Sequence, residues 1–368
     1  MDAIPPDYEE TALSTIAHNG AARVVVGIDT HKDEHVAVAV DGLGVWLGDH
    51  RLSTTTAGYA DLEGWAAGLG DAVTFGVEGT GSYGAGLTRF LSSRGHTVIE
   101  VNRPDRSTRR RLGKSDPIDA ESAARSVLAG PAVGIPKSGT GNVEMIRMVK
   151  IARDSAIKAR SQAMSQMKSL LVTLPAELRE TLDDLPVSKL ARRCAGFRPG
   201  EVSTITSAAK FTLRSIARRH QQLSDEISAL DSELARLTEE TAPELVQAFG
   251  MGPNTAATLL VTAGDNPERL RSESAFAALC GVSPIPASSG KTNRHRLNRG
   301  GDRRANSALH QIVIVRLKSD ERTRSYMERR IKEGKTKLEV IRCLKRYVAN
   351  EVFHMLRQLP NKDIQMAA

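Results

Sequence analysis

The chain has 368 residues, enough for two or three domains that each bury a core. Its formal net charge is +8, and only 4% of its residues are aromatic. A basic excess with few aromatic rings favours contact with the phosphate backbone of a polyanion over stacking on unpaired bases. The apolar runs are too short to cross a bilayer and the acidic start MDAIPPDYEE is unlike a signal peptide, so we expect a cytoplasmic protein, associated with the nucleoid.

Residues 1–22 are expected to form a disordered leader, and strand patterns begin directly after it. Residues 23–29, 35–41 and 45–52 predict three strands joined by tight turns. A helix at 57–69, a strand at 72–78, a helix through Leu87 and Leu91, and a strand at 96–101 follow. Three meandering strands followed by alternating helices and strands predict an α/β domain over 23–130, with a mixed sheet of ribonuclease H-like order.

Acidic residues end two of these strands and begin the next helix. Asp29 ends the first strand in GIDTHKD, and Glu78 ends the fourth in VEGTGSYG. In a sheet of this order the two strands are parallel neighbours, so both carboxylates should emerge at one edge. Asp116 and Asp119 begin the helix in KSDPIDAESAAR, where Asp116 is the expected N-cap and Pro117 the first helical residue.

Four converging carboxylates raise one another's pKa values unless a cation lies between them. Mg²⁺ is the natural choice, with Mn²⁺ as a second candidate, because hard oxygen ligands and substrate phosphate suit it. Two such ions roughly 4 Å apart would clamp the attacking and leaving oxygens of a phosphoryl transfer. The predicted metal ligands are Asp29, Glu78, Asp116 and Asp119. The alternative is local: strand-end turns and a helix whose first turn carries favourable negative charge.

A basic run lies directly before the two helix-starting aspartates. It consists of Arg103, Arg106, Arg109, Arg110, Arg111 and Lys114. We expect these side chains to bring a nucleic-acid backbone to the metal.

A glycine- and proline-containing linker is expected at 131–142, followed by long helices over 143–240. The second of these helices carries apolar residues at alternating four- and three-residue steps, which is the seam of a coiled coil. Its members are Leu223, Ile227, Leu230, Leu234 and Leu237. An antiparallel hairpin within one chain and a dimerising coiled coil both satisfy this pattern.

Residues 241–358 predict a mostly helical domain, before a tail at 359–368. FGMGPNTAATLLVTAGD is similar to a helix-hairpin-helix turn that admits a phosphate, although an ordinary turn between core helices explains its glycines equally well. Three helices are expected after Arg303. The three thiols, Cys194, Cys280 and Cys343, lack metal-ligand spacing and predict small buried apolar side chains.

The segment PASSGKTNRHRLNRGGDRRAN, residues 286–306, has no hydrophobic periodicity and is strongly cationic; we call it the serine loop. Its basic residues are Lys291, Arg294, Arg296, Arg299, Arg303 and Arg304, against one acid, Asp302. Such a segment predicts a phosphate-binding surface. A nucleophilic serine here would need the carboxylates of the first domain, from the same chain or from another.

These motifs together resemble a known family. GIDTHKD, GVEGTGSYG and KSDPIDAESAAR, followed by GMGPNTAATLL, ALCGVSPIPASSGK and LNRGGDRRANSALH, are similar to the DEDD transposases of insertion sequences that move through a circular intermediate, related to the Piv DNA invertase. The resemblance covers about residues 23–350. It implies a RuvC-like nuclease domain, a coiled-coil segment and a C-terminal transposase domain.

The resemblance also assigns roles to residues of this chain. Asp29, Glu78, Asp116 and Asp119 match the DEDD ligands, and Ser289, which precedes Gly290, matches the nucleophilic serine, with Ser288 as the neighbouring alternative. The partners implied are double-stranded DNA of the element ends and target, and a structured noncoding bridge RNA that guides recombination.

Two rival functions remain open on the sequence. One is a RuvC-like junction resolvase or nuclease that uses only the metal, with water as the nucleophile, and the other is a catalytically silent architectural protein. Strand exchange needs at least two active sites, so we expect a homodimer that assembles into a tetramer on nucleic acid. Ser289 of one protomer would then face the carboxylates of another.

Overall fold

The computed structural model describes residues 23–101, 115–130, 134–289 and 295–359. The chain divides into two compact units between Gly139 and Thr140. This division falls within the segment expected as a linker. The predicted leader, and most of the predicted tail, lie outside the described residues.

The N-terminal unit is built on a five-stranded mixed sheet in the order β3-β2-β1-β4-β5. The strands are β1 (Arg23–Thr30), β2 (Glu34–Val40), β3 (Trp46–Ser53), β4 (Ala72–Glu78) and β5 (Thr97–Val101). β1 pairs antiparallel with β2 and parallel with β4, and β4 pairs parallel with β5. The predicted α/β fold class, with its mixed sheet, is confirmed.

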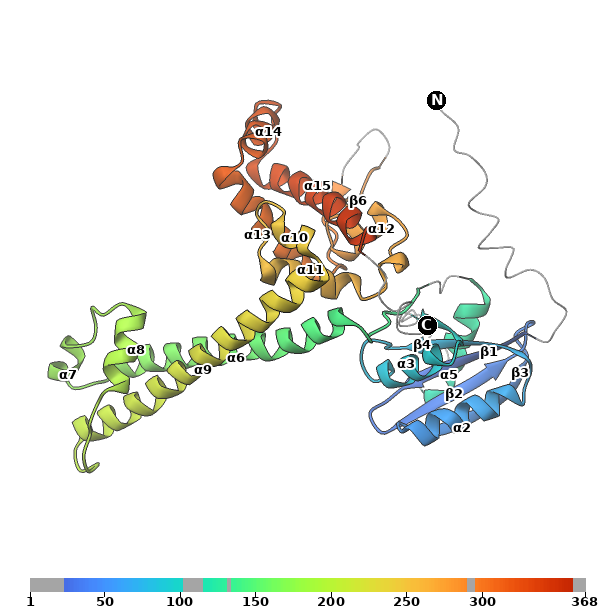
Figure 1. Ribbon diagram of the computed structural model, residues 1–368, viewed down its shortest axis with the longest axis horizontal. Helices are drawn as coiled ribbons and strands as arrows, with labels where there is room; N and C mark the ends of the chain where they lie inside the picture. Colours follow the sequence, from blue (N-terminus) through green and yellow to red (C-terminus); the bar gives the residue numbers. More distant parts are fainter. Residues whose placement is uncertain (1–22, 102–114, 131–133, 290–294, 360–368) are drawn as a thin grey trace. The chain divides into compact units, whose positions relative to one another are not determined.

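Helices cover both faces of this sheet (Figure 1). The even-numbered residues of β1, such as Val26 and Ile28, share a core with Leu62 of α2 (Thr56–Ala67) and Leu87 of α3 (Ala85–Ser93). On the other face, Val25 packs with the alanines of α5 (Asp116–Leu128). Side chains alternate along a strand, so the odd-numbered residues of β1, Asp29 included, belong to the α5 face.

Two glycines let α5 lie directly on the sheet. Gly27 of β1 and Gly76 of β4 are opposite each other in the parallel register. A Cβ atom on Gly27 would lie 2.1 Å from the carbonyl oxygen of Ala120 and 2.2 Å from the amide nitrogen of Ala124. One on Gly76 would lie 2.6 Å from a methyl of Val127. The missing side chains therefore bring the backbone of α5 close above β1 and β4.

The C-terminal unit contains a long helical hairpin (Figure 1). Helices α6 (Asn142–Val172) and α9 (Ile205–Thr241) run side by side in opposite directions. The connection between them carries α7 (Ala176–Glu180) and α8 (Val187–Ala195). These short helices share an apolar core with the adjoining ends of α6 and α9, including Met167, Leu190 and Leu213.

The predicted seam lies on α9 and is used within the chain. Ile227, Leu234 and Leu237 are buried, and the last two share a core with Val143 and Ile146 of α6. The remaining seam members, Leu223 and Leu230, are only half-buried. Of the two arrangements that satisfied the pattern, the structure has the antiparallel hairpin in a single chain.

The rest of the C-terminal unit packs around the open end of the hairpin. Its elements are α10 (Pro243–Gln247), α11 (Pro253–Ala263), η2 (Pro267–Arg269), α12 (Glu273–Leu279), α13 (Arg303–Ser319), α14 (Glu321–Lys332) and α15 (Lys337–Arg357). The three helices expected after Arg303 are present. A two-residue ladder of β6 (Ile285–Pro286) and β7 (His295–Arg296) was not expected, because strands this short leave no alternating pattern.

The glycine turn before α11 has a packing explanation. Gly250 has φ +85°, and a Cβ atom there would approach the side chain of Arg316 and the carbonyl oxygen of Ile312 on α13. Gly252 donates its amide to the Thr255 hydroxyl at 2.9 Å, which caps α11. The turn therefore lets α11 and α13 pack closely. Among the described residues, no helix combines the length and apolar character needed to cross a membrane.

Candidate functional site

Asp29 and Glu78 end two neighbouring parallel strands. Ile28 lies opposite Val77, and each acidic residue is the next one along its strand. Since Gly27 and Gly76 face α5, alternation places Asp29 and Glu78 on that same face. The Thr30 hydroxyl donates to the backbone carbonyl of Glu78 at 2.8 Å and ties the two strand ends together.

The first turn of α5 supplies the other two carboxylates. The helix begins one residue earlier than expected for a cap at Asp116: Ser115 is the N-cap, extended at φ −147°, and Pro117 follows Asp116 within the first turn. The expected N-cap role of Asp116 is therefore wrong, because its own backbone is already helical. Asp116 and Asp119 both lie where the positive end of the helix dipole favours negative charge. Asp119 is buried.

His31 joins this group and was missed by the sequence reasoning. Its Nε2 lies 3.2 Å from Oδ2 of Asp29 and 3.5 Å from Oδ1 of Asp116. These three side chains each offer a ligand atom within 4.8 Å of the others. The signal was available, because His31 follows Asp29 by two residues, the spacing that returns a side chain to the same face of a strand.

The electrostatics at Asp29 are those of crowded carboxylates. Burial raises the pKa of Asp29 above its usual value, and the negative charges of Asp119 and Asp116 raise it further, whereas His31 lowers it. A divalent cation at this place would relieve both the burial cost and the repulsion. Carboxylate oxygens suit Mg²⁺, and a set that includes an imidazole nitrogen also suits Mn²⁺. The donors therefore fit a divalent cation of either kind.

The structure gives a definite position to each predicted ligand. Asp29 and Asp116 both lie close to His31, and the negative charge of Asp119 raises the pKa of Asp29. Glu78 ends the adjacent strand on the same face. The basic run of residues 103–114 lies outside the described residues, as do Lys291 and Arg294 of the serine loop.

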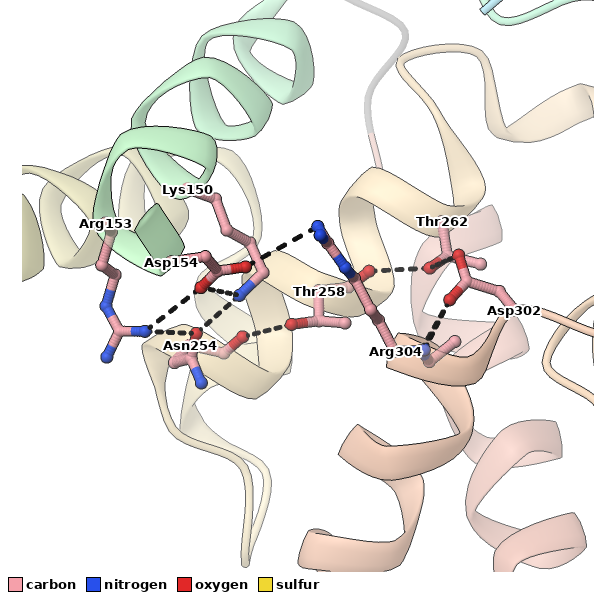
Figure 2. Close-up of polar contacts among 9 residues, drawn as sticks. Lys150, Arg153, Asp154, Asn254, Thr258, Thr262, Asp302 and Arg304 are labelled. Carbon is pink, nitrogen blue, oxygen red and sulfur yellow. Dashed lines mark hydrogen bonds and ion pairs between the residues drawn. The ribbon is translucent and has the colours of Figure 1, made fainter. Parts of the chain in front are cut away.

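A polar network in the C-terminal unit holds the start of α13 (Figure 2). The buried Lys150 of α6 donates to Oδ1 of Asn254 on α11 at 2.7 Å and lies 3.6 Å from Asp154. Burial lowers the pKa of this lysine. Arg304 of α13 reaches Oδ2 of the same aspartate at 3.6 Å. The network thus links three helices, α6, α11 and α13.

The same network reaches the base of the serine loop. Asp302 caps α13, since its carboxylate accepts the backbone amides of Arg304 at 2.7 Å and Ala305 at 3.1 Å (Figure 2). The backbone amide of Asp302 donates to the carbonyl of Leu279 at 2.7 Å, which anchors the end of the loop to α12. The single acid of the loop therefore has a structural role.

The serine loop presents its two serines to solvent. Ser288 and Ser289 are exposed and lie between β6 and β7. Arg296, Arg299 and Arg303 line a pocket of about 1120 Å³ in the same unit. Arg304 instead points to Asp154, so four predicted phosphate contacts of the loop have described positions and three of them are gathered in one place.

This fold, with acidic residues at its strand ends, indicates a class of enzyme. A ribonuclease H-like sheet with carboxylates at the ends of β1 and β4 is suited to metal-assisted phosphoryl transfer on nucleic acid.

Comparison with known proteins identifies the family. Residues 26–174 match the model of the IS110 DEDD transposases, described as a transposase, and residues 242–328 match a model described as the transposase of the IS116/IS110/IS902 family. The chain belongs to this family of transposases and is a DNA transposase enzyme.

Two relatives illustrate the reach of the similarity. The uncharacterized 42 kDa protein of insertion element IS900 from Mycobacterium paratuberculosis is 21% identical over 388 residues, which cover 92% of this chain and 96% of that protein. The uncharacterized 43.6 kDa protein of insertion element IS110 from Streptomyces coelicolor is 28% identical over 155 residues, covering 41% of this chain and 38% of that protein.

Proposed function

We propose that this transposase cleaves and rejoins DNA with a divalent cation held by Asp29, Glu78, Asp116 and Asp119, and with Ser289 as the nucleophile. The metal site is supported by one observation: Asp29, His31 and Asp116 offer ligand atoms within 4.8 Å of one another. Glu78 ends the strand next to that of Asp29. The raised pKa of Asp29 supports the metal site, since a cation would favour the ionised carboxyl. We include His31 as a further donor.

The serine part supplies a covalent intermediate. The Ser289 oxygen would form a bond to a DNA phosphorus, and the bond from that phosphorus to a deoxyribose oxygen would break. The serine proton is lost to a base, and the departing deoxyribose oxygen takes up a proton or keeps its charge near a cation. A bound Mg²⁺ or Mn²⁺ supplies Lewis-acid stabilisation of these oxygens. Arg296, Arg299 and Arg303, which share the pocket beside the loop, would hold the phosphate backbone.

Guidance by a structured noncoding RNA belongs to the same proposal. A protein that leaves sequence reading to base pairing needs contacts with backbone and shape more than with base edges. The net charge of +8 is suited to this. Sequencing of the RNA that co-purifies with the protein tests it: we expect transcripts of the DNA that flanks the gene, and a random sample of cellular RNA would contradict guidance.

Metal binding can be tested without measuring catalysis. Thermal unfolding of the wild type should shift upward with Mg²⁺ or Mn²⁺, because a ligand at about 100 times its Kd stabilises by about 2.7 kcal/mol. Asp29→Asn removes a ligand at nearly constant volume and should abolish the shift and the cleavage of DNA. Glu63→Gln, on α2, is the matched control and should keep both. An equal shift in all three proteins would refute the metal site.

The nucleophile is tested by trapping. DNA containing an element end should become covalently attached to the wild type, and denaturing electrophoresis should show the adduct. Ser289→Ala should lose it and Ser288→Ala, its neighbour, should keep it. Loss in the second variant alone would move the role to Ser288. Cleavage without any adduct would instead favour the metal-only resolvase, which uses water.

A further inference from the structure

The C-terminal unit contains a pocket that the sequence did not predict. Its volume is about 1120 Å³, somewhat more than the roughly 300–1,000 Å³ of typical small-molecule sites. One wall comes from residues 281–284 and from the 295–303 part of the serine loop, and the other comes from α14 and α15. In an enzyme that acts on nucleic acid, a pocket of this size can hold part of a polynucleotide chain.

The pocket is strongly positive. Among the described residues, eight lysine and arginine side chains line it: Arg296, Arg299, Arg303, Arg330, Lys335, Arg342, Lys345 and Arg346. One carboxylate, Glu339, shares the lining, and it is held in the capping box of α15, where its Oε2 accepts from the Thr336 amide and hydroxyl at 2.8 Å. The positive charges therefore greatly exceed the negative ones.

The crowding of positive charges in the pocket affects Lys345. Its ammonium donates to Oδ1 of Asn306 at 2.8 Å. Burial lowers the pKa of this lysine, and the positive charge of Arg342 lowers it further. An anion in the pocket would offset both effects.

Two aromatic rings lie among these cations. The chain has five tyrosines, and two of them, Tyr326 and Tyr347, line this one pocket. Their rings meet edge to face with centroids 5.6 Å apart, and Tyr347 is 58% exposed. Burial and the hydrogen bond with Tyr347 raise the pKa of Tyr326 to about 12, so that ring stays neutral. Tyr326 thus supports an exposed ring on which a base could stack.

Cations combined with an exposed ring point to an unpaired strand rather than a duplex. Duplex backbone binding needs only the positive charge, because paired bases offer no free face to a tyrosine. A single strand places phosphates on the cations and a base on the ring. The low aromatic content of the whole chain predicted contact with the phosphate backbone only. That prediction does not take into account that two of the five tyrosines lie together in this pocket.

The pocket adjoins the serine loop. Pro284 lines the pocket, and Ser289 is five residues further along, at most about 18 Å of extended chain. We propose that the pocket binds an unpaired stretch of the DNA strand next to the phosphate that Ser289 attacks, with its phosphates on the arginines and a base on Tyr347. The position of the attacked phosphate rests on the function proposed above.

Binding of the full-length protein to short oligonucleotides tests this, with fluorescence anisotropy as the readout and a chelator present. The probes are oligothymidine of about ten nucleotides, a duplex of the same length, and oligouridine. Tyr347→Leu should weaken binding of oligothymidine by at least about fivefold and leave duplex binding within about twofold. Tyr347→Phe, which keeps the ring, should bind as the wild type does.

A matched control comes from α9. Phe211 is 54% exposed and lies outside the pocket lining, so Phe211→Leu removes a similar exposed ring and should change nothing. Equal losses for single strand and duplex with Tyr347→Leu would refute the unpaired strand. A loss confined to oligouridine would assign the pocket to RNA and refute the DNA assignment. No loss at all would refute stacking.

The cysteines provide a readout that needs no substitution in the pocket. Cys343 lines the pocket and is half-buried. Burial raises the pKa of Cys194 to about 11 and that of Cys280 to about 12, so these thiols stay protonated and unreactive near neutral pH. A maleimide should label Cys343 first, and oligothymidine should slow that labelling several-fold. Labelling at an unchanged rate under saturating oligothymidine would contradict the proposal.

These measurements are separate from those of the proposed function. Neither requires metal, cleavage or Ser289, and Ser289→Ala should bind oligothymidine as the wild type does. Failure of the trapping experiment would therefore leave the pocket intact, and failure of the binding experiment would leave the nucleophile intact.

Discussion

The geometry of the acidic site depends on two side chains that are absent. Gly27 and Gly76 lie opposite each other below α5, and the two acidic strand ends are two residues further along. The first turn of α5 reaches Asp29 because nothing larger than hydrogen separates the helix from the sheet. A residue without a functional group thus determines where the charged groups meet.

Gly27→Ala should therefore damage both the fold and the site. Its new methyl group would meet backbone atoms of Ala120 and Ala124, which cannot rotate away as a side chain can. We expect a loss of at least about 1–3 kcal/mol in the free energy of unfolding, and loss of metal-dependent stabilisation. Urea unfolding with and without Mg²⁺ measures both.

The control for this substitution is Gly64→Ala. Gly64 lies inside α2, and a Cβ atom there would have no neighbour within 4 Å among the described residues. Alanine is preferred over glycine within a helix, so this variant should gain roughly 0.5–1 kcal/mol. A Gly27→Ala protein as stable as the wild type would show that α5 can move away without cost.

His35 should make the N-terminal unit sensitive to acid. It is buried against Tyr59, and its Nε2 has no hydrogen-bond partner among the described residues. Burial lowers its pKa below the usual 6.5. The unfolded chain then binds the proton more tightly, so the stability that neutral His35 contributes is complete above pH 6.5 and is lost as the pH falls through the lowered pKa.

His35→Phe keeps the ring and removes this titration. At neutral pH we expect a change within about 1 kcal/mol, since the lost acceptor for the His31 amide offsets the removal of an unpaired nitrogen. Below pH 6.5 the variant should become steadily more stable relative to the wild type, as measured by thermal unfolding against pH. A constant difference across that range would contradict the assignment.

Among the elements, the hairpin of α6 and α9 allows a graded test of the seam. Leu234 is buried, whereas Leu223 is half-buried on the same helix. Leu234→Ala should cost about 2–5 kcal/mol of unfolding free energy, and Leu223→Ala about 1 kcal/mol. If Leu223→Ala costs as much as Leu234→Ala, further chains must cover Leu223 in solution, and its variant should then also shift the oligomeric state measured by sedimentation.

The sequence predicted the elements well where periodicity is strong, while the role of the acidic residues as metal ligands stays a prediction. The alternation in 35–41 and the order of the strands predicted that Asp29 and Glu78 lie at one edge of the sheet. In the structure they end neighbouring parallel strands. His31 was missed because a histidine after a strand has many structural explanations. The pocket could not be predicted, since Tyr347 and Arg346 come together with Ser283 only through the packing of α15 on α12.

For the whole molecule, we propose how the two units are arranged during catalysis. We expect a dimer that forms a tetramer on nucleic acid, with Ser289 of one protomer facing the carboxylates of another. Mixing Asp29→Asn with Ser289→Ala protein tests this, because some mixed assemblies would hold one intact composite site. Covalent DNA attachment should reappear in the mixture. If subunits exchange and no adduct forms beyond that of either variant, each site is built within one chain.

The polar network of Lys150, Asp154 and Arg304 connects the long hairpin to the start of α13, which follows the serine loop (Figure 2). A rotation of α6 about its own axis would separate Asp154 from Arg304 and so remove one contact that holds the start of α13, beside the cap at Asp302. Under the proposed assembly, a contact between the hairpins of two copies that rotated α6 would therefore also act on the base of each serine loop. In that case assembly would also influence the position of Ser289, the proposed nucleophile.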